Sequence, residues 1–111
     1  MGLDIEEIGR INEDMWSLLF TPSEIEALQS EKYLPPQTLS TVFFSLKESL
    51  FKYQFPIYHL DIDFQEVRII PLSAHDFRVD IVSPKIPKSV FNSVSLHFIL
   101  YDKHVISFVK G

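Results

Sequence analysis

The chain has 111 residues, of which 46% are hydrophobic and 14% aromatic, which is enough for one domain with an apolar core. The absence of cysteine excludes disulfides, thiolate metal sites and thiol nucleophiles. No run of about eighteen apolar residues and no signal-peptide pattern is present, so a cytoplasmic protein without a membrane span is expected by default. The net charge of −5, concentrated as acid in residues 1–30, disfavours nucleic-acid binding.

Residues 2–8 have the Ile/Leu pattern of a short strand. Alternate side chains of a strand share a face, so Asp4 and Glu6 are expected to point one way and Glu7 the other. This arrangement makes a carboxylate pair. An exposed acidic strand end is the simpler alternative, and Glu7 competes with Glu6 if the strand ends early.

Residues 8–19 predict a helix or helical turn, and Thr21-Pro22-Ser23-Glu24 marks the start of a further helix that runs to about Ser30. Thr21 is the expected N-cap, Pro22 the first helical residue and Glu24 the residue that completes a capping box. Most acids of this region are interpreted as solvent-exposed helix faces, namely those of Glu13, Glu24 and Glu26.

The longest predicted helix begins at Pro35-Pro36 and ends near Tyr53, before Pro56. Its core face is one arc about 100° wide, formed by Leu39, Val42, Phe43, Leu46, Leu50 and Tyr53. Phe44 and Phe51 form a second aromatic seam that some other group should cover. Glu48 lies beside this seam and would be partly desolvated, so it needs a partner or a cation.

After Pro56 the hydrophobic pattern changes to period two, which is typical of strands. The expected strands are residues 67–71, 77–82, 93–101 and 104–109, with a hairpin turn at Asp102-Lys103. Helices that come mostly first and strands that come mostly last favour an α+β fold, in which the long helix packs on an antiparallel sheet of three to four strands.

Two short motifs carry the chemistry: Gly2-Leu3-Asp4-Ile5-Glu6, and residues 44–52, which read FSLKESLFK. Magnesium prefers oxygen ligands, usually one or two carboxylates completed by phosphate oxygens and water. Lysines serve as point charges for phosphates. Glu48 and Lys52 are four residues apart, which is also the spacing of an ordinary surface ion pair. The two motifs together favour phosphate-transfer chemistry.

The same two motifs resemble the signature pair of the 4′-phosphopantetheinyl transferases, in which Gly-x-Asp with an acid two residues later precedes a Lys-Glu-Ser and a further Lys. The resemblance extends to residues 63–68 and 104–109, which look like the second half of the enterobactin- and surfactin-synthase type. It implies Mg²⁺-dependent transfer of phosphopantetheine from coenzyme A to a serine of an acyl or peptidyl carrier protein.

By this resemblance, Asp4, Glu6 and Glu48 hold the magnesium ion, while Lys47 and Lys52 contact the phosphates of coenzyme A. Glu48 and Lys52 are the expected catalytic residues, with Glu48 helping to deprotonate the attacking serine. Glu7 matches the acid position of a shorter branch of the family, which leaves a choice between Glu6 and Glu7.

The longer type has two similar halves, and this chain, taken as one domain over residues 1–111, corresponds to the second. The shorter branch assembles as homotrimers. The resemblance therefore implies either a homo-oligomer or a missing N-terminal half, with the Phe44 and Phe51 seam at the missing interface. The alternative from another functional class is a non-catalytic α+β interaction module that has kept the scaffold.

Overall fold

A computed structural model describes residues 1–30 and 33–111 of the protein. The elements in chain order are β1 (Gly2–Glu7), η1 (Glu13–Met15), α1 (Trp16–Leu19), α2 (Pro22–Ser30), α3 (Pro36–Tyr58), η2 (Phe64–Glu66), β2 (Val67–Pro71), β3 (Phe77–Ile81), η3 (Lys88–Phe91), β4 (Ser95–Tyr101) and β5 (His104–Lys110).

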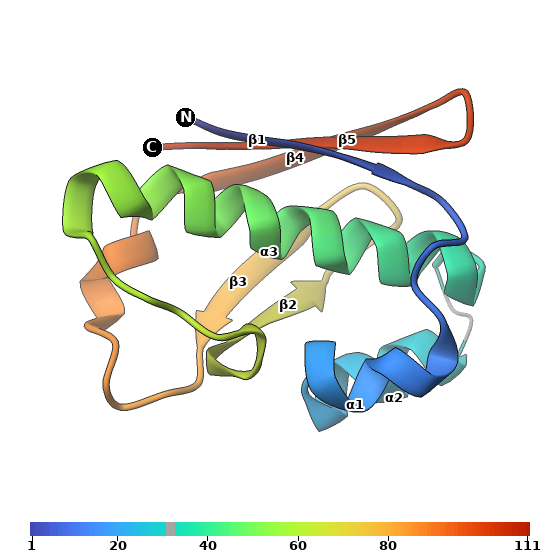
Figure 1. Cartoon of the computed structure of the whole chain (residues 1–111), viewed down its shortest axis with the longest axis horizontal. Helices are drawn as coiled ribbons and strands as arrows, with labels where there is room; N and C mark the ends of the chain where they lie inside the picture. Colours follow the sequence, from blue (N-terminus) through green and yellow to red (C-terminus); the bar gives the residue numbers. More distant parts are fainter. Residues whose placement is uncertain (31–32) are drawn as a thin grey trace.

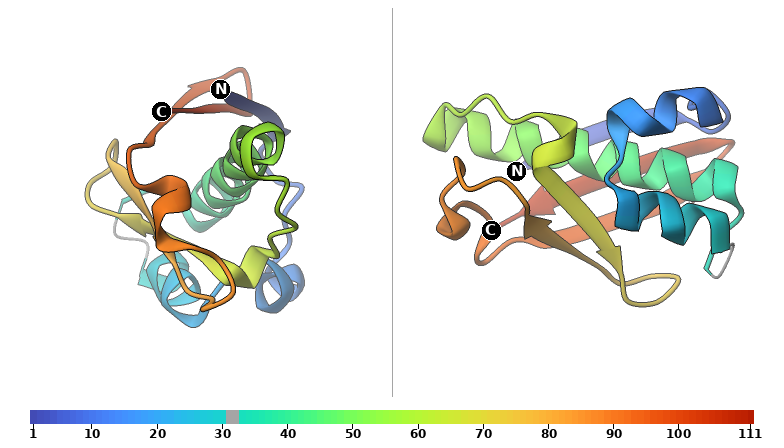
Figure 2. Two further views of the ribbon diagram at one scale, coloured as in Figure 1. Left: turned by 90° about the vertical axis from the view of Figure 1, so that its left-hand side faces the viewer. Right: turned by 90° about the horizontal axis from the view of Figure 1, so that it is seen from below.

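The long helix α3 lies between two antiparallel sheets (Figure 1). On one side is the sheet β1-β5-β4, and on the other are the hairpin β2-β3 and the short helices α1 and α2. The views in Figure 2 show α3 running through the middle of the molecule, with both chain termini on the side of the three-stranded sheet. The α+β prediction is confirmed, with one three-stranded sheet and a separate hairpin among the described residues.

The predicted core face of α3 is confirmed. Five of its six residues are fully buried, namely Leu39, Val42, Phe43, Leu46 and Leu50. Tyr53 is half-buried and packs against the same core. The predicted end at Tyr53 is wrong, because the helix continues through Pro56 to Tyr58. Proline in the last turn removes a single backbone donor, and the Gln54 side chain closes this end by bonding both the N–H and the carbonyl of Leu60.

The N-terminal connection is less helical than predicted. Of residues 8–19, only η1 and α1 are helical, since Gly9, with φ of 101°, turns the chain directly after β1. The start of α2 follows the prediction: the Thr21 N–H donates to Glu24 Oε1 at 2.8 Å, and the Glu24 N–H donates to Thr21 Oγ1 at 3.4 Å. Glu24 itself, however, is fully buried and not on a solvent-exposed face.

The predicted strands are present within one or two residues of their expected bounds. β4 and β5 are joined at Asp102 and Lys103, which both have a positive φ (48° and 65°). A two-residue hairpin turn of type I′ requires a positive φ at both of its central residues. Among the described residues, no helix is both long and apolar enough to cross a membrane.

Candidate active site

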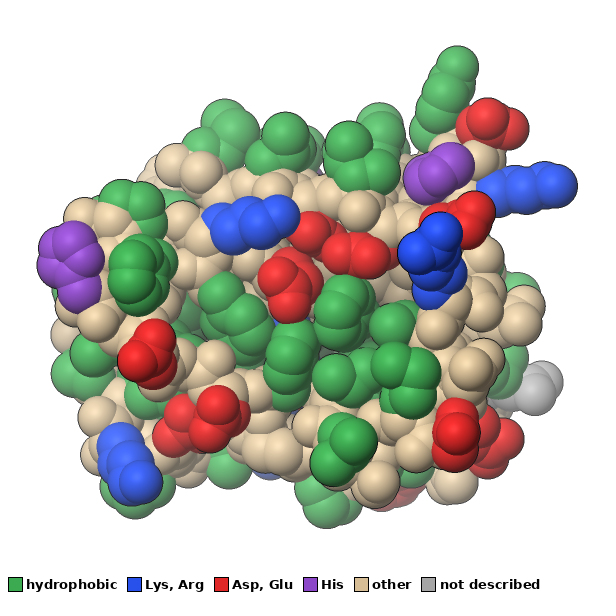
Figure 3. All heavy atoms as spheres, in the orientation of Figure 1, with side chains coloured by type: hydrophobic (Ala, Val, Ile, Leu, Met, Phe, Trp, Pro, Cys, Tyr) green, Lys and Arg blue, Asp and Glu red, His purple; other side chains and the backbone are tan. Residues whose placement is uncertain are grey.

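Acidic residues of β1 face α3 at the free edge of the three-stranded sheet. Asp4 lies opposite Ser107 of β5 and is only 5% exposed. The Lys52 ammonium of α3 reaches across to it, 3.0 Å from Asp4 Oδ1 and 3.1 Å from the Leu3 carbonyl. Figure 3 shows acidic side chains gathered beside a basic one on this face of the molecule, above a group of hydrophobic side chains.

Glu6 and Glu48 belong to the same electrostatic cluster. Burial raises the pKa of Glu6 to about 7, helped by a hydrogen bond to Asp4 and by the charges of Asp4 and Glu48, while Lys52 acts in the opposite direction. Burial, and then the charge of Asp4, also raise the pKa of Glu48. Three carboxylates therefore share one nearby ammonium, and the cluster has an excess of negative charge.

Close approach of α3 to the sheet brings these groups together. A Cβ atom on Gly2 would lie 1.8 Å from the Ser49 carbonyl oxygen, so β1 can lie this close to the helix only with glycine at that position. Behind Asp4, three small buried side chains meet: Ser107 Oγ lies 2.7 Å from Ser45 Oγ and 2.6 Å from Ser49 Oγ. Hydroxyls that satisfy one another allow the helix and β5 to pack closely without orphaned polar groups.

The donor set suits a hard cation such as Mg²⁺. Asp4 Oδ2 is buried and has no hydrogen-bond partner among the described residues, which leaves this oxygen available to a cation. The side chains are not, however, already arranged as a cage: no group of three or more His, Cys, Asp or Glu within residues 1–30 and 33–111 has metal-holding geometry. Binding of an ion would require these side chains to turn toward it.

Glu7 stands apart from this cluster. It is exposed, and its carboxylate pairs with Arg10 at 3.2 Å on the surface. The alternation along β1 thus brings Glu6, and not Glu7, to Asp4.

Lys47 is not part of the cluster either. Its side chain is fully buried, and its ammonium lies 2.8 Å from Glu24 Oε1. Burial lowers the pKa of Lys47, whereas Glu24 acts to raise it. This enclosed position does not fit the expected contact between Lys47 and the phosphates of coenzyme A. Lys47 follows Phe43 by four residues and precedes Leu50 by three, a spacing that could have signalled burial.

The aromatic seam of α3 is covered within the chain. The Phe64 ring stacks on Phe44 at 5.3 Å and meets Phe51 edge-on at 5.2 Å. The expectation that a group covers the seam is confirmed, but that group is Phe64. The seam is not left open for a missing half.

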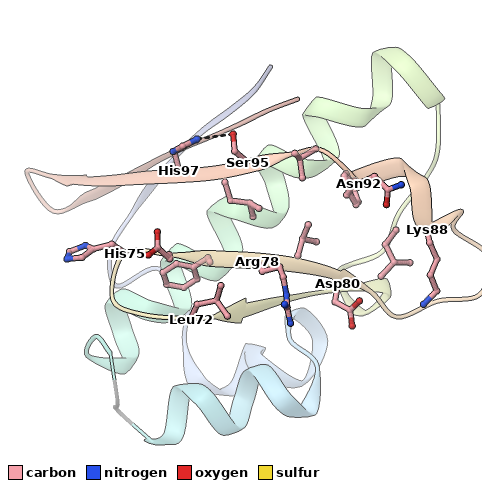
Figure 4. Close-up of a pocket in the computed structure, with 15 residues that line it drawn as sticks. Leu72, His75, Arg78, Asp80, Lys88, Asn92, Ser95 and His97 are labelled. Atoms are coloured by element: carbon pink, nitrogen blue, oxygen red, sulfur yellow. Dashed lines mark hydrogen bonds between the residues drawn. The ribbon is translucent and has the colours of Figure 1, made fainter.

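The described residues line a smaller and a larger hollow. A small one of about 450 Å³ lies directly beside Lys52, lined mainly by apolar side chains such as Phe51, Phe55 and Leu60. A larger one of about 810 Å³ separates β3 from β4, away from the carboxylates. In Figure 4 its charged neighbours Arg78 and Asp80 project from β3 away from this gap. The candidate active site is therefore the carboxylate cluster and not the larger hollow.

Comparison with known proteins identifies the family. A family model described as the 4′-phosphopantetheinyl transferase superfamily matches residues 1–109. The chain belongs to this superfamily. No curated protein sequence matches the chain.

Solved structures of holo-[acyl-carrier-protein] synthases share the fold. The holo-[acyl-carrier-protein] synthase of Thermotoga maritima matches 97% of this chain with a TM-score of 0.75 and 20% identity, and the chain spans 60% of that protein's length. The match to the Helicobacter pylori synthase in complex with coenzyme A covers 98% of each chain (TM-score 0.68, 18% identity). An ACPS–CoA complex of Chronobacterium ammoniagenes matches 96% of this chain and 90% of its own (TM-score 0.70, 15% identity).

Proposed function

We propose that the protein transfers 4′-phosphopantetheine from coenzyme A to a serine of an acyl or peptidyl carrier protein. The observation that carries this proposal is the gathering of Asp4, Glu6, Glu48 and Lys52 where β1 packs on α3. Membership of the superfamily and the similar structures bound to coenzyme A support it.

In this proposal Asp4, Glu6 and Glu48 would hold Mg²⁺, and the bound ion would supply positive charge against the pyrophosphate of coenzyme A. Lys52, half-exposed beside Asp4, contacts a phosphate. The serine oxygen of the carrier forms a bond to the phosphorus that bears pantetheine, and the bond to the leaving nucleotide breaks. Glu48 accepts the serine proton. The apolar hollow beside Lys52 offers a surface for the pantetheine arm.

Mass measurement of the carrier tests the function. The protein is mixed with Mg²⁺, coenzyme A and an apo-carrier protein, and the carrier is weighed for the gain of one phosphopantetheine group. Glu48→Gln should abolish the gain, because it removes a charged ligand and the proton acceptor together. Glu26→Gln, the same change at an exposed site on α2, should not. A fully active Glu48→Gln variant contradicts the assignment, and a wild-type chain that binds no Mg²⁺ and no coenzyme A favours a non-catalytic interaction module.

We also infer that a second copy of the chain covers the outer face of the three-stranded sheet. One row on that face is apolar throughout, since Ile5 lies across from Ile106, which in turn lies across from Ile99. In the neighbouring row Leu3 lies across from Phe108, which lies across from His97. Leu3, Ile5 and Ile99 are each more than half exposed. Monomeric proteins rarely leave such a continuous apolar row uncovered. Association with a separate N-terminal half remains the alternative prediction.

A further inference from the structure

The buried Lys47 has no donor left for a ligand. Its ammonium donates to Glu24 Oε1 at 2.8 Å, to the Leu19 carbonyl at 3.0 Å and to the Phe64 carbonyl at 2.5 Å. An ammonium has three N–H donors, so all of them are used inside the protein. The role of this lysine must therefore be sought in what these bonds hold in place.

Glu24 is equally saturated. Oε1 accepts the Thr21 N–H as well as the Lys47 ammonium, and Oε2 accepts the Ile69 N–H at 2.6 Å. The pair consequently connects α3 to the start of α2 and to β2. Gln65 adds a further tether to the segment before β2, since its amide donates to the Phe20 carbonyl at 2.6 Å.

The bond from Lys47 to the Phe64 carbonyl links this pair to the carboxylate site. The Phe64 ring closes over Phe44 and Phe51. Phe44, Glu48 and Phe51 succeed one another at spacings of four and three residues, so they lie along one side of α3. The Phe64 ring thereby completes an apolar wall beside Glu48.

We propose that Lys47 and Glu24 are positioning residues that fix the Phe64 backbone, so that the Phe64 ring completes the wall beside Glu48. This inference rests on the proposed function of the carboxylate site and deepens it. An apolar wall excludes water and strengthens the attraction between a carboxylate and a cation. Stability alone is a poor explanation for the pair, because well-packed apolar residues usually stabilise a core at least as well as a buried ion pair.

The key variant is the double substitution Lys47→Met/Glu24→Gln, which removes both charges and with them the bond to the Phe64 carbonyl. Lys47→Met alone would leave a buried unpaired carboxylate and could prevent folding. Phe64→Ala is the second variant, since it deletes the half-buried ring but keeps the ion pair. Tyr58→Ala is the matched control, because this exposed aromatic residue of α3 does not line the apolar hollow beside Lys52.

The readouts are Mg²⁺ binding by calorimetry, with the metal alone, and NMR contacts between the rings of Phe64, Phe44 and Phe51. We expect the double variant and Phe64→Ala each to bind Mg²⁺ about 10-fold to 100-fold more weakly than wild type, the range typical for groups that orient metal ligands. The double variant should also lose the Phe64 ring contacts while keeping those between β1 and β5. Tyr58→Ala should bind as wild type does.

A double variant that folds, keeps the Phe64 ring contacts and binds Mg²⁺ with wild-type affinity overturns the positioning role and leaves the proposed function standing. Wild-type affinity in Phe64→Ala overturns it as well. If the wild-type chain binds no Mg²⁺ and modifies no carrier, the proposed function fails first. The ring contacts then still decide whether Lys47 and Glu24 fix the Phe64 segment.

Discussion

At the scale of single residues, the site places three carboxylates near a single ammonium. Lys52 bonds Asp4 directly, while burial, together with the charge of Asp4, raises the pKa values of Glu6 and Glu48. Such crowding is unfavourable for folding in the absence of a cation, and it is typical of functional sites, where charges are held ready for a ligand.

The crowding predicts a pH-dependent stability. Glu6 ionises near 4.5 in the unfolded chain but near 7 in the folded one, so the folded state binds the extra proton between these values. Stability should therefore fall as pH rises through this window and stay lower above it. Thermal unfolding at pH 5 and pH 8 measures this effect. Glu6→Gln should reduce the difference in Tm, and Mg²⁺ should raise the Tm of the wild type at pH 8. A Tm that rises from pH 5 to 8 without metal would contradict the crowded cluster.

A methyl group at position 2 should separate β1 from α3. The Cβ of Gly2→Ala would meet backbone atoms of Ser49 and Tyr53, which cannot turn aside. We expect a loss of about 1–3 kcal/mol in the free energy of unfolding, measured with denaturant, and weaker Mg²⁺ binding. Gly111→Ala is the matched control, because there the new atom would meet only the tip of the Tyr53 side chain. Wild-type stability in Gly2→Ala would show that the strand has room to move.

The candidate site was predictable where its residues follow a local period. Strand alternation placed Asp4 with Glu6, and the helix repeat placed Glu48 with Lys52. The burial and pairing of the Lys47 ammonium were not predictable in this way. Its partners, Glu24 and the Phe64 carbonyl, come from segments 23 and 17 residues away along the chain. Helical spacing shows which side chains share a face, but not which distant segment covers that face.

At the scale of elements, α3 organises the molecule, and its predicted core face was correct because hydrophobic spacing alone determines it. The predicted end of α3 was not correct, since a proline in the last turn costs only one backbone hydrogen bond, and the Gln54 side chain holds Leu60 just beyond the helix. The connection after β1 was also misjudged, because Gly9 turns the chain through a positive φ that a helical pattern does not reveal.

The contact between α3 and β5 predicts a cost for losing a single hydroxyl. Ser107→Ala should leave the buried hydroxyls of Ser45 and Ser49 without their shared partner and lower the free energy of unfolding by about 1–3 kcal/mol. Ser40→Ala is the control, because this buried hydroxyl bonds only the Gln37 carbonyl, which Thr41 also bonds. Denaturant unfolding compares the two. Equal losses would mean that the serine cluster contributes nothing beyond burial.

At the scale of the whole molecule, one face of the three-stranded sheet packs on α3 and the other presents an apolar row to its surroundings. The described fold places no helix over this outer face (Figure 1). This contrast between the two faces is the physical basis for expecting association between copies.

Solution mass checks the assembly. Light scattering should give a multiple of the 12.9 kDa chain mass for the wild type. Ile99→Lys should reduce this mass to that of one chain, because it places a charge at one end of the apolar row that Ile5, Ile106 and Ile99 form. Leu18→Lys, an equally drastic change at an exposed position of α1, should not alter it. A monomeric wild type would refute the homo-oligomer.

The two lysines of the signature motif also differ in a way that chemical labelling can exploit. The Lys52 side chain is 52% exposed, whereas that of Lys47 is 0% exposed. An amine-acylating reagent should therefore modify Lys52 in the native protein and reach Lys47 only after denaturation. Protection of Lys52 by coenzyme A, read by peptide mass spectrometry, would then map the ligand onto a single amine, with Lys47 serving as the internal measure of intact folding.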